Sequence, residues 1–415
     1  MTPSARLAAA IDLLGAIGQS PRPADATAQE FFRTRRYIGS TDRRAVSERV
    51  WSLLRAARRL TWWLDRAGLP DIPPLRLAAA LLLEGWTELT LTQACSGGKY
   101  APARLAEVDL VRLRQLEGHT LSHPAQPLAV RLELPDFLLA PLQARFGPAL
   151  EAEMQALMTE APLDLRVNLL KATRDQAIAA LAEEGIAATL TPHSPWGLRI
   201  AGRRPVVTGP AFRNGLVEIQ DEGSQLVADL VAAGPDMRVA DYCAGAGGKT
   251  LALAMTMQNR GHIVALDVSV PRLEAAAKRL RRAGVHNAEC HHIEPGDKWA
   301  KRRAASFDRV LVDAPCTGTG TWRRNPDARL TLTEADLAEL TAKQAAILQA
   351  ASVLVKSGGR LIYATCSLLE AENEGQVAMF LARNPGFRRY GQALSLTPRR
   401  DGTDGFFAQS LERVA

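Results

Sequence analysis

FDRVLVDAPCTGTGTWRRNP, residues 307–326, begins as a strand and ends in a turn. Residues 310–312 form a short, partly β-branched apolar run that favours a buried strand. The run stops at Asp313, and Cys316 follows three residues later. Because open α/β sheets bind their ligands outside the carboxyl ends of the strands, we expect this carboxylate and this thiol to lie at a reactive site.

A second strand is predicted at residues 359–365, GRLIYAT, and it runs directly into Cys366. We expect the two strands to be neighbours in one sheet, so that Cys316, Cys366 and Asp313 come together at one edge. A single cysteine is as often a small buried hydrophobe. The prediction of a site therefore depends on both thiols following strand ends.

Strands and helices alternate strictly from about residue 236 onward. This pattern predicts an α/β fold with a doubly wound, mostly parallel, Rossmann-like sheet. The predicted strands are residues 238–243, 262–267, 289–293, 308–313 and 360–365. The predicted helices begin at Lys249, span 271–283 and 333–354, and end near Leu381; residues 406–411 are predicted to form a late edge strand.

The part of the chain before the alternating region has a different pattern. Residues 1–140 are predicted to form an all-α bundle, and 141–230 to form linker helices and a small α+β module. In the module, Thr173 is the expected N-cap of a helix over 173–184. We therefore expect three domains, with the boundaries 1–140, 141–230 and 231–415.

Composition narrows the class of protein. The 415 residues carry a net charge of +7, and arginines cluster between residues 33 and 59, which is compatible either with an RNA-binding face or with a solvated helix face. The five cysteines are odd in number and form no C-x-x-C pair, so we expect neither a disulfide scaffold nor a metal site. No apolar run reaches transmembrane length and no signal peptide is visible, so we expect a cytoplasmic monomer without membrane contact.

The first turn of the alternating region predicts a cofactor site. Small residues at 243–248 would let the backbone approach a ligand, and the helix that follows presents free N–H groups to an anion. Asp267, at the end of the next strand, would accept hydrogen bonds from ribose hydroxyls. The spacing differs from the dinucleotide pattern G-x-G-x-x-G, so S-adenosyl-L-methionine fits better than a dinucleotide, although a plain structural turn stays possible.

Two thiols beside such a cofactor suggest one particular reaction. The C5 carbon of cytosine is not nucleophilic, but a thiolate that adds to C6 makes it so. C5 could then attack the methyl sulfonium, and loss of the C5 proton would allow the thiol to leave. A carboxyl group could hold the proton at ring nitrogen 3.

These motifs resemble the RsmB/Sun family of RNA (cytosine-5) methyltransferases, of the bacterial rRNA type. The resemblance covers residues 130–415 and includes DAPCTG at 313–318, RRNPD at 323–327, YATCS at 363–367, RVNLLK at 166–171 and DGFF at 404–407. The helical N-terminus resembles an antitermination-factor-like RNA-binding module. The resemblance implies methyl transfer from S-adenosyl-L-methionine to C5 of an RNA cytosine.

The resemblance also implies roles for individual residues. Cys366 would attack C6, Cys316 would promote product release, and Asp313 would contact both cofactor and cytosine. Glu294 would be a further cofactor contact, with Asp297 as its rival. The remaining implied cofactor-binding residues are Cys243, Ala244, Gly245, Ala246, Gly247, Gly248, Lys249 and Asp267.

Several alternatives stay open at this point. The RNA partner is expected to be 16S rRNA, with tRNA as the close alternative. A non-catalytic, RNA-binding ribosome assembly factor could keep the same fold and basic face. A DNA-type cytosine methyltransferase would use Cys316 as its nucleophile, and the thiol at Cys366 argues against it.

Overall fold

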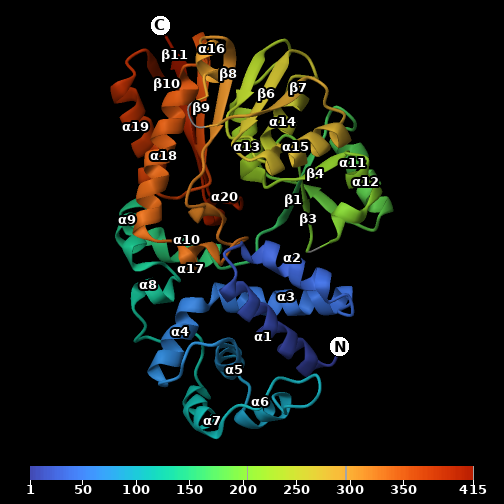
Figure 1. The fold of residues 1–415 in the computed structure, drawn as a ribbon, viewed down its shortest axis with the longest axis vertical. Helices are drawn as coiled ribbons and strands as arrows, with labels where there is room; N and C mark the ends of the chain where they lie inside the picture. The colour runs from blue at the N-terminus through green and yellow to red at the C-terminus, as the bar shows by residue number, and fades with distance from the viewer. Residues whose placement is uncertain (203, 295–296, 415) are drawn as a thin grey trace. The chain divides into compact units, whose positions relative to one another are not determined.

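The alternating strands and helices predicted after residue 236 are present in the computed structural model, which describes residues 1–202, 204–294 and 297–414 (Figure 1). The chain divides into two units, Met1–Met158 with Trp322–Leu332, and Thr159–Thr321 with Thr333–Ala415. In the described part of the chain, no helix is both long and apolar enough to cross a lipid bilayer.

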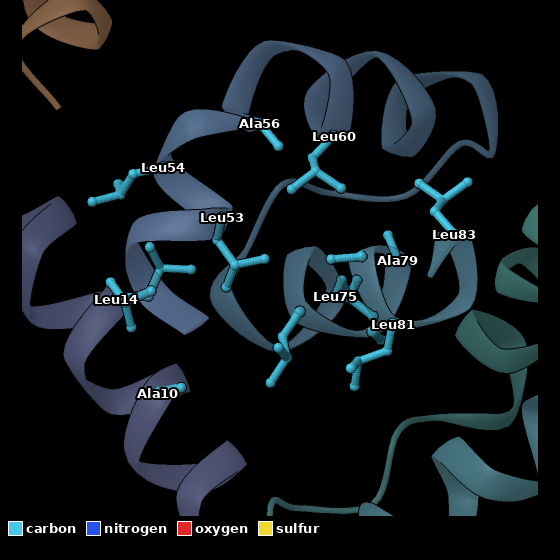
Figure 2. Close-up of a cluster of buried hydrophobic side chains, with 14 of the residues drawn as sticks. Ala10, Leu14, Leu53, Leu54, Ala56, Leu60, Leu75, Ala79, Leu81 and Leu83 are labelled. Atoms are coloured by element: carbon cyan, nitrogen blue, oxygen red, sulfur yellow. The ribbon is translucent and has the colours of Figure 1, made fainter. Parts of the chain in front are cut away.

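The first unit is all-helical, as predicted. Its α-helices are α1 (Pro3–Gln19), α2 (Ala24–Thr34), α3 (Ser40–Arg55), α4 (Ala57–Arg66), α5 (Pro73–Leu83), α6 (Glu88–Ala94), α7 (Glu107–Leu113), α8 (Leu128–Arg131), α9 (Asp136–Phe146), α10 (Leu150–Leu157) and α17 (Ala328–Thr331). Leucine and alanine side chains from α1, α3, α4 and α5 form one buried cluster (Figure 2). This cluster is the core of the unit.

The segment Trp322–Leu332 folds with this helical unit, although it follows the Pro-Cys motif directly in sequence. Arg329 is buried and donates a hydrogen bond from Nη2 to the Arg55 carbonyl, 3.1 Å away. The Asp327 carboxylate accepts a hydrogen bond from the Ala24 N–H at 2.9 Å. The chain thus leaves the second unit after Thr321, packs against α2 and α3, and returns at Thr333.

The second unit opens with a small antiparallel sheet in the order β2-β3-β1-β4. Its elements are β1 (Leu163–Val167), α11 (Arg174–Glu183), β2 (Ala188–Leu190), β3 (Gly197–Ile200), α12 (Pro210–Arg213) and β4 (Val217–Ile219). The predicted cap is confirmed, because Thr173 and Gln176 form a capping box at the start of α11.

The main sheet has seven strands in the order β10-β11-β9-β8-β5-β6-β7. The strands are β5 (Arg238–Asp241), β6 (His262–Asp267), β7 (Ala288–His292), β8 (Phe307–Asp313), β9 (Val355–Thr365), β10 (Phe387–Leu396) and β11 (Phe406–Arg413). The helices of this part are α13 (Glu222–Leu230), α14 (Gly248–Thr256), α15 (Val270–Ala283), α16 (Trp299–Arg302), α18 (Glu334–Ser352), α19 (Glu374–Arg383) and α20 (Pro398–Asp401). Pairing is parallel from β9 through β7, whereas β11 is antiparallel to both of its neighbours.

The alternation of side chains along β8 explains the layers of the sheet. Val310 and Val312 pack with α18 and α19 on one face, whereas Leu311 packs with α13 and α14 on the other (Figure 1). Both faces are covered, which is why the strand is a continuous apolar run rather than an alternating one. The doubly wound, mostly parallel fold predicted from the sequence is confirmed.

Two details of the prediction were wrong. Residues 406–411 were expected to form an edge strand, but β11 lies inside the sheet between β9 and β10. The true edge strand, β10, was not predicted, because most of its residues are exposed and it lacks the apolar pattern of a buried strand. An exposed edge strand that pairs on one side carries little sequence signal.

Candidate active site

The carboxyl ends of β8 and β9 bring the two motif cysteines together. The strands run parallel with Asp313 opposite Ala364, and the Ala314 N–H donates to the Ala364 carbonyl at 2.8 Å. Both chains then turn away from the sheet at the same edge. As a result, Cys316 Sγ lies 3.4 Å from Cys366 Sγ. The structure therefore places the two predicted thiols in direct contact.

The contact between the two sulfurs affects the protonation of Cys316. Cys316 donates or accepts depending on which sulfur holds the proton. The hydrogen bond to Cys366 and burial both raise the pKa of Cys316 well above its usual range. Cys316 therefore keeps its proton, and its S–H can donate a hydrogen bond to Cys366 Sγ.

Asp313, the third predicted residue, pairs with a buried lysine. Lys249 Nζ lies 2.6 Å from Asp313 Oδ2, and the lysine side chain is only 10% exposed. Burial lowers the pKa of Lys249, but the charge of Asp313, the hydrogen bond to Asp313 and the charge of Asp241 together outweigh burial, so the pKa is raised overall. The lysine is therefore charged, and it holds the carboxylate beside the thiols.

The predicted cofactor turn runs from Cys243 to Lys249, between β5 and α14. Gly247 has φ of 77°, and a Cβ at this position would lie 2.9 Å from Ala276 Cβ. Only glycine therefore allows the turn to approach α15 and still point the first N–H groups of α14 outward. This is the geometry that a carboxylate ligand requires at a helix N-terminus.

The acidic residue at the end of β6 braces this turn. Asp267 is buried, and its two carboxylate oxygens accept hydrogen bonds from the N–H groups of Gly245 and Ser269, each at 2.8 Å. A carboxylate oxygen has a second lone pair, so these contacts leave acceptor capacity for a ribose hydroxyl. Asp267 thus lies where the sequence predicted it and also holds the loop.

Cys243, by contrast, is not a reactive thiol. Burial and the nearby carboxylate of Asp313 raise its pKa far above the usual range for cysteine. A thiol that stays protonated is a poor nucleophile. Its contribution to the turn is therefore its backbone and its small size.

A cavity of about 560 Å³ lies next to the ends of β6 and β7. Its lining is mainly apolar and includes Tyr242, Val268, Ile293 and Ile347, together with two acidic residues, Glu294 and Asp297, and two basic ones, Lys301 and Lys343. A mainly apolar cavity that also carries carboxylates suits the adenosine part of S-adenosylmethionine. Both Glu294 and Asp297 line the cavity, and one oxygen of Asp297 already accepts a hydrogen bond from the Trp299 N–H at 2.8 Å.

Sequence reasoning missed a buried polar cluster beside the thiols. Its members are Thr317, Thr319, Gln344, Ser367, Glu372 and Asn373. Thr317 and Ser367 each follow a motif cysteine, and this adjacency was the available signal. Gln344 and Glu372 come from other elements, and nothing in their sequence spacing indicates that they reach the site.

The sheet order, the helix N-terminus beside the Gly-rich turn and the carboxylate at the end of β6 define an S-adenosylmethionine-dependent methyltransferase. Residues 229–412 match the family model described as 16S rRNA methyltransferase RsmB/F, and residues 134–207 match its ferredoxin-like domain. The chain belongs to this family of RNA methyltransferases, and S-adenosylmethionine is its methyl donor.

Individual relatives support the assignment. A probable ribosomal RNA small subunit methyltransferase B from Synechocystis is 31% identical, over 91% of this chain and 92% of its own. The ribosomal RNA small subunit methyltransferase B of Pseudomonas putida is 34% identical, over 74% and 72%. Among solved structures, a methyltransferase homologue from Pyrococcus horikoshii has a TM-score of 0.61 at 28% identity, covering 69% of this chain and 97% of its own.

Proposed function

We propose that this protein methylates C5 of a cytosine in RNA through a covalent adduct between Cys366 and C6 of the base. The observation that carries the proposal is the 3.4 Å contact between Cys316 Sγ and Cys366 Sγ at the carboxyl edge of the sheet. A single catalytic thiol would suffice for attack on C6. A second thiol in contact with the first indicates that it has a separate role in the making or breaking of the same carbon–sulfur bond.

The residues of this chain would act in the following order. The thiolate of Cys366 donates an electron pair to C6 and forms the S–C6 bond, and C5 becomes nucleophilic. Ring nitrogen 3 takes up a proton from water as C6 is attacked, and the carboxylate of Asp313, oriented by Lys249, accepts a hydrogen bond from that N–H and so stabilises the adduct. S-adenosylmethionine supplies the electrophilic methyl group when bound.

Release requires two further bond changes. The C5 proton passes to a water molecule, the electron pair of the broken C–H bond re-forms the C5–C6 double bond, and Cys366 departs as a thiolate with the electrons of the S–C6 bond. Cys316 is the side chain in contact with that sulfur, and we assign it the promotion of this step. The target base must be exposed or flipped out of its helix to reach the two thiols.

Small-subunit ribosomal RNA is the proposed substrate, because the relatives similar over most of this chain carry that name. The helical unit would hold the RNA by phosphate and shape contacts, since arginines are frequent on α3 and α4. Transfer RNA is the alternative that the experiment below distinguishes.

Covalent trapping tests the proposal. Wild type, Cys316→Ala, Cys366→Ala and the control Cys290→Ala are incubated with total RNA and S-adenosylmethionine and run on a denaturing gel. We expect a protein–RNA adduct to accumulate in Cys316→Ala, to be absent in Cys366→Ala, and to match wild type in the control. Sequencing the trapped RNA identifies the substrate. Accumulation in Cys366→Ala instead would reverse the two roles and refute the mechanism.

A further inference from the structure

The carboxylate of Glu372 is buried directly beneath the two thiol-bearing loops. Glu372 ends a short 3₁₀ turn, Glu370–Glu372, between β9 and α19, and its side chain is 0% exposed. Among the residues that the structure describes, four hydrogen-bond donors surround it, and none of them is on a lysine, arginine or histidine. A carboxylate is costly to bury, so its retention at this place calls for an explanation.

The four donors come from both cysteine motifs and from α18. Oε1 accepts hydrogen bonds from the Thr317 N–H at 2.8 Å and from Gln344 Nε2 at 2.9 Å. Oε2 accepts from the Thr317 hydroxyl at 2.5 Å and from the Ser367 hydroxyl. Thr317 follows Cys316, and Ser367 follows Cys366. One carboxylate therefore joins the residue after each thiol.

Further hydrogen bonds, made by Gln344 and Thr319, connect the two loops that carry the cysteines. Gln344 also donates to the Pro315 carbonyl at 3.0 Å, so the residues before and after Cys316 are held together. Thr319 Oγ1 lies 3.1 Å from Ser367 Oγ and accepts the Leu368 N–H at 2.7 Å. These bonds tie the loop after β8 to the loop after β9.

We propose that Glu372 is a positioning residue that sets the separation of the two thiols by clamping Thr317 and Ser367 to one carboxylate. The proposal rests on the proposed function, in which both thiols act at a single carbon–sulfur bond. In such a reaction a displacement of about 1 Å costs on the order of a hundredfold in rate. In the described part of the chain no hydrogen bond joins Glu372 to either thiol, so it acts through Thr317 and Ser367.

Two substitutions of Glu372 distinguish the effect of its hydrogen bonds from the effect of its negative charge. Glu372→Ala removes both acceptor oxygens, so the Thr317 N–H loses its partner, whereas Gln344 keeps the Pro315 carbonyl and Ser367 keeps Thr319. Glu372→Gln keeps one acceptor oxygen, and its amide can donate to the two hydroxyl oxygens, so most of the clamp survives without the charge. Glu370→Gln is the matched control, since Glu370 lies on the same turn with an exposed side chain.

The first readout is the rate at which Cys316 and Cys366 form a disulfide in the apo enzyme. Diamide takes two electrons and two protons from the thiol pair, and peptide mapping by mass spectrometry detects the bond. We expect Glu372→Ala to slow this reaction by about tenfold, because the thiols are no longer held in contact. Loss of the charge alone would lower the pKa of Cys316 and speed oxidation, so a slower reaction reports geometry.

The second readout is steady-state methylation of RNA. We expect kcat to fall by about a hundredfold in Glu372→Ala and by less than about tenfold in Glu372→Gln. The KM for S-adenosylmethionine should stay within about twofold of wild type in both, because the Gly-rich turn is a separate loop. If Glu372 served only as a buried charge, kcat would fall as far in Glu372→Gln as in Glu372→Ala.

The outcomes decide between the clamp and a general structural role. A folded Glu372→Ala with wild-type disulfide rate and kcat overturns the proposal, as does a loss of activity that appears only in the KM for S-adenosylmethionine. If the alanine variant does not fold, Ser367→Ala cuts the link on the Cys366 side alone, and a wild-type disulfide rate in that variant overturns the proposal. The disulfide readout needs no RNA, so it still tests the clamp if cytosine methylation itself is refuted.

Discussion

The ion pair between Lys249 and Asp313 allows a quantitative prediction. Lys249 Nζ lies 2.6 Å from Asp313 Oδ2, and the two side chains are 10% and 30% exposed. At this distance the attraction is about 6 kcal/mol with an effective dielectric constant of about 20. Desolvation offsets much of this, so we expect Asp313→Asn, which leaves the buried lysine unpaired, to cost roughly 3 kcal/mol in unfolding free energy.

The assay is thermal unfolding of the apo enzyme. A loss of roughly 3 kcal/mol corresponds to a fall in Tm of roughly 6–12 °C for a unit of this size. Glu412→Gln is the control, because its partner Arg388 is 69% exposed and the pair is expected to contribute less than about 1 kcal/mol.

The pH dependence of this cost has a definite sign. The pKa of Lys249 is raised in the folded wild type, so its contribution is present below the ordinary value of 10.5 and is lost as the pH rises through the folded pKa. In Asp313→Asn, burial would dominate and lower that pKa, so the deficit of the variant should shrink as the pH rises from the lowered folded pKa towards 10.5. A Tm within about 2 °C of wild type, or a deficit that does not depend on pH, would refute the reasoning.

Two further predictions concern the cofactor site. Gly247→Val should raise the Kd for S-adenosylmethionine by at least about tenfold in calorimetry, because the new side chain meets Ala276 and φ is 77°; an unchanged Kd would show that the turn does not hold the cofactor. Glu294→Gln should raise the same Kd by about tenfold, and Asp297→Asn by less, because one oxygen of Asp297 already caps Trp299. The opposite order would assign the cofactor contact to Asp297.

The strands of the parallel core could be predicted from the sequence, and so could the edge of the sheet at which the site lies. Residues 310–312 are buried on both faces, so burial itself leaves a readable apolar run. Strand β10 left no such run, because it pairs with β11 alone and is mostly exposed. The position of β11 between β9 and β10 could not be predicted either, since order within a sheet depends on pairing rather than on the composition of one strand.

In the candidate site, too, one part of the arrangement could be predicted from the sequence and another part could not. That Cys316 and Cys366 would be neighbours follows from parallel strands that end at one edge, and the register of Asp313 with Ala364 produces this result. That their sulfurs would lie 3.4 Å apart does not follow from strand ends, because loops after parallel strands can diverge. The separation is determined by side chains from α18 and from the turn before α19, above all by Glu372. The residues that set the distance between the two cysteine motifs therefore lie outside those motifs. Sequence motifs predict the reactive groups, but they do not predict the side chains that hold these groups in place.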